Sequence, residues 1–245
     1  MPALSLLLLA LAGFVSSVLN ILAGGGSFLT LPLLIFLGVP AAEANATNRV
    51  GVVAQNLSGS VGFQRHGVMD WGFARPAIVP CVLGAVLGSW AALHVSDRDF
   101  RRLLSIMMLA MTLFTLAGTA RGRLTATGGP RAALTFAGFL GVGLYGGFIQ
   151  AGVGFLLLAL TSLLGLDLVR GNAVKVLLVL VQTLVSLCIF ALNGKVAWVP
   201  GLALAAGSLV GGHVGVHLTV LKGHAWLQRV VTVTIVLFAF RLWFD

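Results

Sequence analysis

The chain has 245 residues, of which 59% are hydrophobic and only 9% are charged, and its mean hydropathy is +1.07. About a quarter of the residues of a soluble domain are charged, so this composition excludes a soluble protein and indicates an integral membrane protein. The net charge of +9 does not indicate a nucleic-acid partner, because no basic stretch is interleaved with aromatic residues; we attribute it to the basic loops of a membrane protein.

Apolar stretches recur along the whole chain and predict an all-α polytopic membrane protein. Most are long enough to cross about 30 Å of hydrocarbon as helices, which satisfy their own backbone groups there. The second and the seventh have 13 residues each and follow glycine-rich turns, so we expect short or broken helices. In chain order the stretches cover residues 2–22, 27–39, 44–63, 72–95, 103–120, 132–149, 152–164, 173–192, 199–221 and 230–244.

The chain also contains an internal repeat. Residues 25–88 align without a gap on residues 152–215, an offset of 127. The first stretch, residues 2–22, matches the residues before Gly152 and so belongs to the repeated unit; we therefore expect it to be retained and not cleaved as a signal peptide. A repeat in a hydrophobic chain is typical of a pseudosymmetric transporter whose site lies between the halves. The matches include glycines, amides and tryptophans: Gly25, Phe28, Gly38, Asn45, Ala46, Gln55, Gly67, Trp71, Gly84 and Gly88 fall on Gly152, Phe155, Gly165, Asn172, Ala173, Gln182, Gly194, Trp198, Gly211 and Gly215.

The repeat divides one membrane domain into residues 1–120, a polar connector at 121–131, and residues 132–245. In each half we expect a glycine-rich broken or re-entrant hairpin followed by three transmembrane helices. A hairpin makes the two halves inverted, with ten segments, whereas one broken pass makes them parallel, with eight. Loop lysines and arginines divide 8 to 5 between the two sides in the inverted case and 7 to 6 in the parallel case. The inverted arrangement, with the amino terminus outside, is therefore favoured.

The third segment of each half carries polar residues, which are costly in a membrane helix unless they face a partner or a water-filled cavity. At 100° per residue these side chains share an arc of about 80°. The alternative is that the amides only join helices across a buried interface. The two polar faces comprise Asn45, Asn48 and Gln55 in the first half and Asn172, Lys175 and Gln182 in the second.

Arg49 and Lys175 place positive charge in these segments. All six acidic residues lie in predicted loops or at the carboxyl end, so no carboxylate is expected beside the two cations. Such a site favours an anion. The alternative is that both side chains extend to the nearby membrane interface.

Glycine-rich turns precede both short helices, at Gly24-Gly-Gly-Ser27 and Ala151-Gly-Val-Gly154. Each exposes backbone N–H groups and the positive end of a helix dipole where a ligand can approach closely. We expect Gly25, Gly26, Ser27, Gly152 and Gly154 to contribute to an anion cradle. The alternative is a packing or hinge device.

His213 and His217 stand four residues apart and could bind a metal or relay protons. No third ligand lies in their segment, so we expect a polar lining of the path and no metal site.

Cys81 and Cys188 lack metal-ligand spacing. We find no enzymatic motif, and no cofactor is expected.

The chain resembles the TauE/SafE family of sulfite and organosulfonate exporters over nearly its whole length. Family members are multi-pass inner-membrane permeases of bacteria and archaea, and the resemblance implies export of a small sulfur-containing anion. It rests on Gly24-Gly-Gly-Ser-Phe-Leu-Thr-Leu-Pro-Leu-Leu34, Gly38-Val-Pro, Ala44-Asn-Ala-Thr-Asn48 and Gly67-Val-Met-Asp-Trp71, echoed by Gly165-Leu-Asp, Asn172 and Gly194-Lys-Val-Ala-Trp198.

The sequence therefore predicts a permease of two inverted repeats in the bilayer that moves a small anion by alternating access, one half rocking against the other. A homodimer is compatible with this prediction. The alternatives are a metal-cation permease that uses His213 and His217, and a membrane assembly protein without a substrate. The expected contacts to the anion come from Gly25, Gly26, Ser27, Asn45, Asn48, Arg49, Gly152, Gly154, Asn172 and Lys175, with Gln55 and Gln182 along the path.

Overall fold

A computed structural model describes residues 1–22, 24–118 and 131–244, and within these residues it contains helices and no strands. The predicted all-α class is confirmed. The helices are α1 (Ala3–Leu22), α2 (Ser27–Phe36), α3 (Ala41–Arg65), α4 (Trp71–Leu93), α5 (Asp97–Gly118), α6 (Arg131–Phe148), α7 (Val153–Leu163), α8 (Leu168–Leu192) and α9 (Trp198–Phe244).

Four helices among the described residues are long and apolar enough to cross a membrane: α1, α4, α8 and the Trp198–Leu221 part of α9. The helices α2 and α7 have 10 and 11 residues, so the prediction of two short segments after the glycine-rich turns is confirmed. The 25-residue helix α3 is not among the four because of its polar residues, most of which are buried by neighbouring helices.

Glycines end the same helices in both halves. Gly38 and Gly165 follow α2 and α7 with φ of 89° and 98°, and Gly67 and Gly194 follow α3 and α8 with φ of 66° and 67°. In all four places the glycine N–H and the next N–H return to carbonyls of the last helical turn, as in the Schellman motif. Only glycine adopts these angles without strain.

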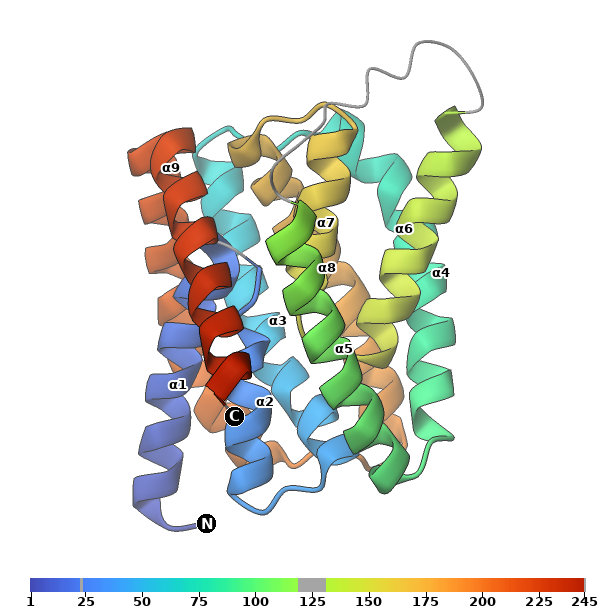
Figure 1. Ribbon diagram of the computed structural model, residues 1–245, viewed down its shortest axis with the longest axis vertical. Coiled ribbons are helices and arrows are strands. Elements are labelled where there is room, and N and C mark those ends of the chain that lie inside the picture. The colour runs from blue at the N-terminus through green and yellow to red at the C-terminus, as the bar shows by residue number, and fades with distance from the viewer. Residues whose placement is uncertain (23, 119–130, 245) are drawn as a thin grey trace.

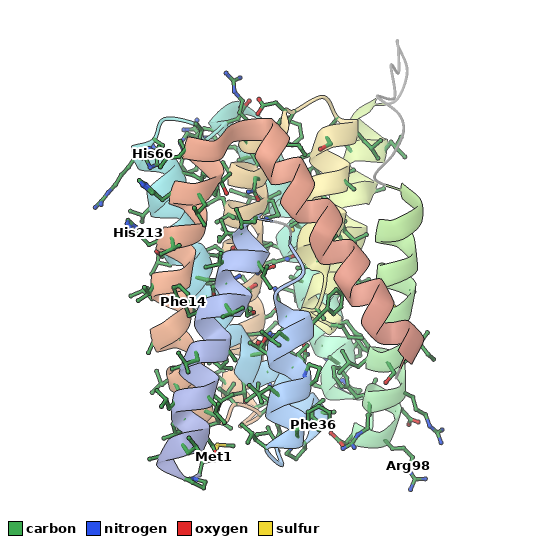
Figure 2. All side chains as sticks on the ribbon, turned by 60° about the vertical axis from the view of Figure 1, so that its left-hand side comes forward. Met1, Phe14, Phe36, His66, Arg98 and His213 are labelled. Atoms are coloured by element: carbon green, nitrogen blue, oxygen red, sulfur yellow. The ribbon has the colours of Figure 1, made fainter. Side chains whose placement is uncertain are left out.

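The helix directions can be followed in Figure 1. The helix α3 begins at the end of the molecule where Phe36 and Arg98 lie and ends near His66 (Figure 2), whereas α8 runs the opposite way. The helix α9 bends, and its last part runs back along the molecule. These directions agree with inverted halves; the repeat relation itself stays a prediction.

The first helix of each half packs along the fourth helix of the other half, as α1 on α9 and α4 on α6. Glycines allow the backbones to approach: a Cβ on Gly88 would overlap the Leu144 carbonyl oxygen, and one on Gly211 would overlap that of Phe14. Small residues are the usual device for close helix packing in membranes. The halves are therefore interlocked.

The packing defines two mixed bundles. One contains α1, α2, α3 and the first part of α9, and the other contains α4, α6, α7 and α8. The two bundles adjoin along α3 and α8, and we call this boundary the seam. The two polar segments that the sequence analysis identified are the two helices of the seam.

Two glycines of α6 test this packing. A Cβ on Gly143 would overlap the Cys81 carbonyl oxygen, whereas one on Gly141 would meet nothing within 4 Å. We expect Gly143→Ala to cost about 1–3 kcal/mol through overpacking, and Gly141→Ala to be neutral or slightly stabilising. Thermal unfolding of the detergent-purified variants measures the difference. Equal Tm values for both would contradict the close approach of α4 and α6.

Candidate functional site

The polar side chains of the seam are buried. None is more than 2% exposed, so neither cation extends to the membrane interface and that alternative is wrong. Both seam helices turn their polar faces into the protein, as the spacing predicted. The buried set comprises Asn45, Asn48, Arg49, Gln55, Asn172, Lys175 and Gln182.

Arg49 crosses the seam to the end of α6. Its Nη1 donates to the Gly146 carbonyl at 3.0 Å and to Gln150 Oε1 at 2.8 Å, and its Nη2 donates to the Gly147 carbonyl at 2.6 Å. The guanidinium lies 4.9 Å from the centre of the Phe190 ring. The last carbonyls of a helix have no intrahelical partner and carry its negative dipole end, so a cation is stabilised there.

Lys175 crosses the seam in the opposite direction, to the end of α1. Its Nζ donates to the carbonyls of Asn20 at 2.8 Å and Ile21 at 3.0 Å, in the last turn of that helix. Asn20 and Gly147 are 127 positions apart, so the two cations bind equivalent helix ends. Both cations thus make contacts within the protein, and their binding of an anion stays a prediction.

The centre of the protein carries excess positive charge. No Asp or Glu is buried among the side chains that the structure describes, and the ion pairs Asp97–Arg101 (3.6 Å) and Asp167–Arg170 (3.5 Å) lie at exposed helix starts. Arg49 and Lys175 are therefore compensated by carbonyl dipoles and not by carboxylates.

The amides of α3 bind the turns. Asn45 Nδ2 donates to the Phe148 carbonyl at 2.9 Å, and its Oδ1 accepts from the Gln150 N–H at 3.3 Å. Asn48 Nδ2 donates to Ser27 Oγ at 3.2 Å, and Asn48 Oδ1 accepts from Thr30 Oγ1 at 2.6 Å. Asn45 thus joins the bundles, and Asn48 positions the start of α2.

Other buried polar atoms have no hydrogen-bond partner in the described part of the chain. Leaving such an atom unpaired costs about 1–3 kcal/mol, so a polar group or water is expected beside it. They lie along the seam and the helices beside it, and so form a series of buried polar groups through this part of the protein. The atoms are Ser17 Oγ, Arg49 Nε, Gln55 Nε2, Ser60 Oγ, Asn172 Nδ2 and Oδ1, Gln182 Nε2 and Ser186 Oγ.

The two glycine-rich turns touch each other. A Cβ on Gly24 would lie 2.5 Å from the Gly154 carbonyl carbon, and Phe28 stacks on Phe155 with ring centres 6.3 Å apart. A Cβ on Gly25 would meet the Phe155 ring at 2.5 Å. In this conformation the glycines therefore serve close packing of the turns, and a ligand would lie beside the contact.

The short helices begin without a side-chain cap, at Gly26 for α2 and at Gly152, with φ of 77°, for α7. The long helices α4 and α8 are capped by the carboxylates of Asp70 and Asp167. A carboxylate is a preferred cap because it accepts from free N–H groups. The two inner helix starts thus lack the anion that the outer ones have.

Gln150 is a residue of the site that the sequence did not indicate. It is 2% exposed, and its Oε1 accepts from Arg49 and from Thr183 Oγ1 at 3.3 Å. The available signal was a lone amide just before the second turn. The repeat obscured it, because the equivalent position is Ala23.

His213 and His217 are both exposed, whereas the glycines at 211, 212 and 215 of the same helix α9 are buried. His213 lies on the outside of the molecule (Figure 2). Residues two positions apart in an α-helix point to nearly opposite sides, so His213 and His217 face away from the buried glycines at 211 and 215. The expectation that the histidines line the path is therefore wrong. The described residues contain no group of three metal-ligating side chains.

A cavity of about 120 Å³ lies at the end of the seam where α3 begins. Its lining includes exposed Lys195, buried Asn45 and Phe190, whose ring contacts the Arg49 guanidinium. Its lining comprises Pro40, Ala42, Glu43, Asn45, Ala92, Leu93, Val95, Asp97, Phe100, Phe190 and Lys195.

Apolar spans around broken helices and a buried cationic seam define a polytopic membrane protein of the transporter class. The family model described as "Sulfite exporter TauE/SafE" matches residues 9–242, and the chain belongs to this family. It is a membrane transporter of the TauE/SafE family.

Several bacterial proteins are similar over almost the whole chain. A probable membrane transporter protein of Haemophilus influenzae is 28% identical, with 98% of this chain and 95% of the relative covered. The probable membrane transporter protein YfcA of Escherichia coli is 29% identical, with 96% and 87% covered. ORF9 of Sinorhizobium sp, also a probable membrane transporter protein, is 24% identical, with 97% and 92% covered. No solved structure matches the chain.

The contacts of Arg49 predict a structural role that can be measured. We expect Arg49→Met to lower the free energy of unfolding by roughly 1.5–3 kcal/mol, because charge-assisted bonds to three acceptors are lost. Arg65→Met, at the exposed end of the same helix, is the control and should be nearly neutral. Thermal unfolding in detergent compares them, and equal stability of the two variants would show that the cap is unimportant.

Proposed function

We propose that this protein exports a small oxyanion, with sulfite and organosulfonates as the leading substrates, across the bacterial inner membrane, and that it is a permease and not an enzyme. The observation that carries the proposal is the pair of buried cations, Arg49 and Lys175, without a buried carboxylate among the described side chains. The family description supports the substrate class.

The charge balance favours an anion. Two cations contribute +2, and the two helix ends that they cap contribute about −0.5 each. The uncapped starts of α2 and α7 add about +0.5 each, so the centre keeps roughly +2. Unneutralised charge in a membrane interior is costly, and a bound anion reduces that cost.

The seam offers the donors that an oxyanion needs. Arg49 and Lys175 supply charge, Asn45, Asn48 and Asn172 supply amide groups, and the turns at Gly25, Gly26, Ser27, Gly152 and Gly154 supply backbone N–H groups. In this proposal Gln55 and Gln182, each with an unpaired Nε2, line the path.

Alternating access would move the mixed bundles and not the two sequence halves, because glycine packing holds α1 on α9 and α4 on α6. The bonds from Arg49 and Lys175 to the opposite bundle act as two latches across the seam. An anion competes with the carbonyls for each cation. Binding would therefore weaken a latch and favour separation of the bundles.

The distribution of basic residues bears on the orientation in the membrane. In the inverted arrangement predicted from the sequence, loop arginines and lysines divide 8 to 5 in favour of the side that contains Arg65. In this proposal that side, next to His66, faces the cytoplasm, and the cavity beside Asn45 faces outward. His213 and His217 are exposed and lie outside the seam, which argues against the metal-cation alternative.

Flux measurements test the proposal. We expect Arg49→Gln and Lys175→Gln to lower sulfite efflux from proteoliposomes at least about tenfold, since each removes a charge that stabilises the bound anion. Arg65→Gln and His213→Ala, both at exposed positions, are controls and should keep wild-type flux. Unchanged flux in both seam variants, or loss of a metal-dependent flux in His213→Ala, would overturn the anion mechanism.

A further inference from the structure

Asn45 and Asn172 occupy equivalent positions on α3 and α8, and both are fully buried, yet their carboxamides differ. Asn45 bonds to the Phe148 carbonyl and the Gln150 N–H across the seam. Neither Nδ2 nor Oδ1 of Asn172 has a hydrogen-bond partner among the residues that the structure describes. Equivalent residues are thus used differently: one holds the bundles together, and the other is unpaired.

Lys175 lies one helical turn from Asn172, on the same face of α8, so their Cβ atoms are roughly 5–6 Å apart. An ammonium group has three donors. Two of them bind the carbonyls of Asn20 and Ile21, which leaves one N–H of Lys175 without an assigned acceptor. Asn172 and Lys175 therefore start from adjacent turns of one face of α8, the first with an unpaired carboxamide and the second with one donor left to assign.

Both atoms of the Asn172 carboxamide are unpaired, so the requirement on a ligand is the same whichever way the amide is turned. The nitrogen needs an acceptor and the oxygen needs a donor. A bare oxyanion supplies acceptors only. An oxyanion that also carries an O–H or N–H group satisfies both atoms and accepts from Lys175.

We propose that Asn172 and Lys175 form a subsite that selects oxyanions bearing their own hydrogen-bond donor, such as a hydrogen oxyanion or a hydroxyalkyl sulfonate. The inference rests on the proposed anion transport and adds which anions the site would select. A site that hydrogen-bonds a hydroxyl discriminates strongly against an analogue that lacks it, because the buried polar group is then left unpaired.

The test compares two sulfonates that differ by one hydroxyl. Binding of 2-hydroxyethanesulfonate and of ethanesulfonate to the purified protein is measured by calorimetry. We expect the wild type to prefer the hydroxyl compound by at least about tenfold. Asn172→Ala should abolish the preference, because it should weaken the binding of 2-hydroxyethanesulfonate and leave the binding of ethanesulfonate unchanged. Asn56→Ala removes another buried amide of the seam, which bonds only to its own helix, and should keep the preference.

Stability without ligand provides a second readout. Asn172→Ala should leave the Tm unchanged or raise it, because it removes an unpaired group, whereas Asn45→Ala should lower it by roughly 2–8 °C. If the alanine variant does not fold, Asn172→Leu, which preserves more volume, replaces it in the binding test. A fall in Tm for Asn172→Ala with binding unchanged would show that the amide is structural and overturn the subsite.

The outcomes separate the two proposals. Equal binding of both sulfonates to the wild type, or a preference that survives in the Asn172 variant, overturns the subsite and leaves anion transport standing. Failure of the wild type to bind sulfite and either sulfonate overturns the proposed substrate class and the subsite with it.

Discussion

A positive charge buried in a membrane must be compensated inside the protein, and here the compensation comes from the ends of broken helices. Because α1 and α6 stop next to glycine-rich turns, their last carbonyls are free to accept Lys175 and Arg49. Each cation belongs to the opposite bundle. The break in one helix and the charge on another are therefore one structural unit, which both joins the bundles and keeps cations in the interior.

Glycine has two separate roles in this architecture. Along α4 and α6, and along α1 and α9, it brings backbones into contact and makes rigid pairs from different parts of the sequence. At the two central turns it lets Gly24 and Gly154 touch. The first role defines the bodies that could move, and the second places two uncapped helix starts at the boundary between them. Function in a bilayer then depends on how easily the seam opens.

The seam is stabilised unequally on its two sides. Gln150 bonds to Arg49, Asn45 and Thr183, whereas the carboxamide of Asn172 on α8 has no partner in the described part of the chain. Unpaired polar atoms lower stability, and proteins retain them where a ligand, water or a second conformation supplies the missing partner. This inequality is the structural basis on which a nearly symmetric chain could treat its substrate asymmetrically.

The sequence by itself determined the membrane class, the two short helices after the glycine turns and the inward direction of the polar faces, because these depend on composition and on the 3.6-residue period. It could not determine that Arg49 and Lys175 bind helix ends, that Gln150 completes the network, or that His213 faces outward. Those facts depend on which helix packs beside which. The repeat even obscured Gln150, since a residue present in one half only carries no periodic signal. Tertiary structure decided the partners, because a buried charge takes the acceptor that packing places within reach.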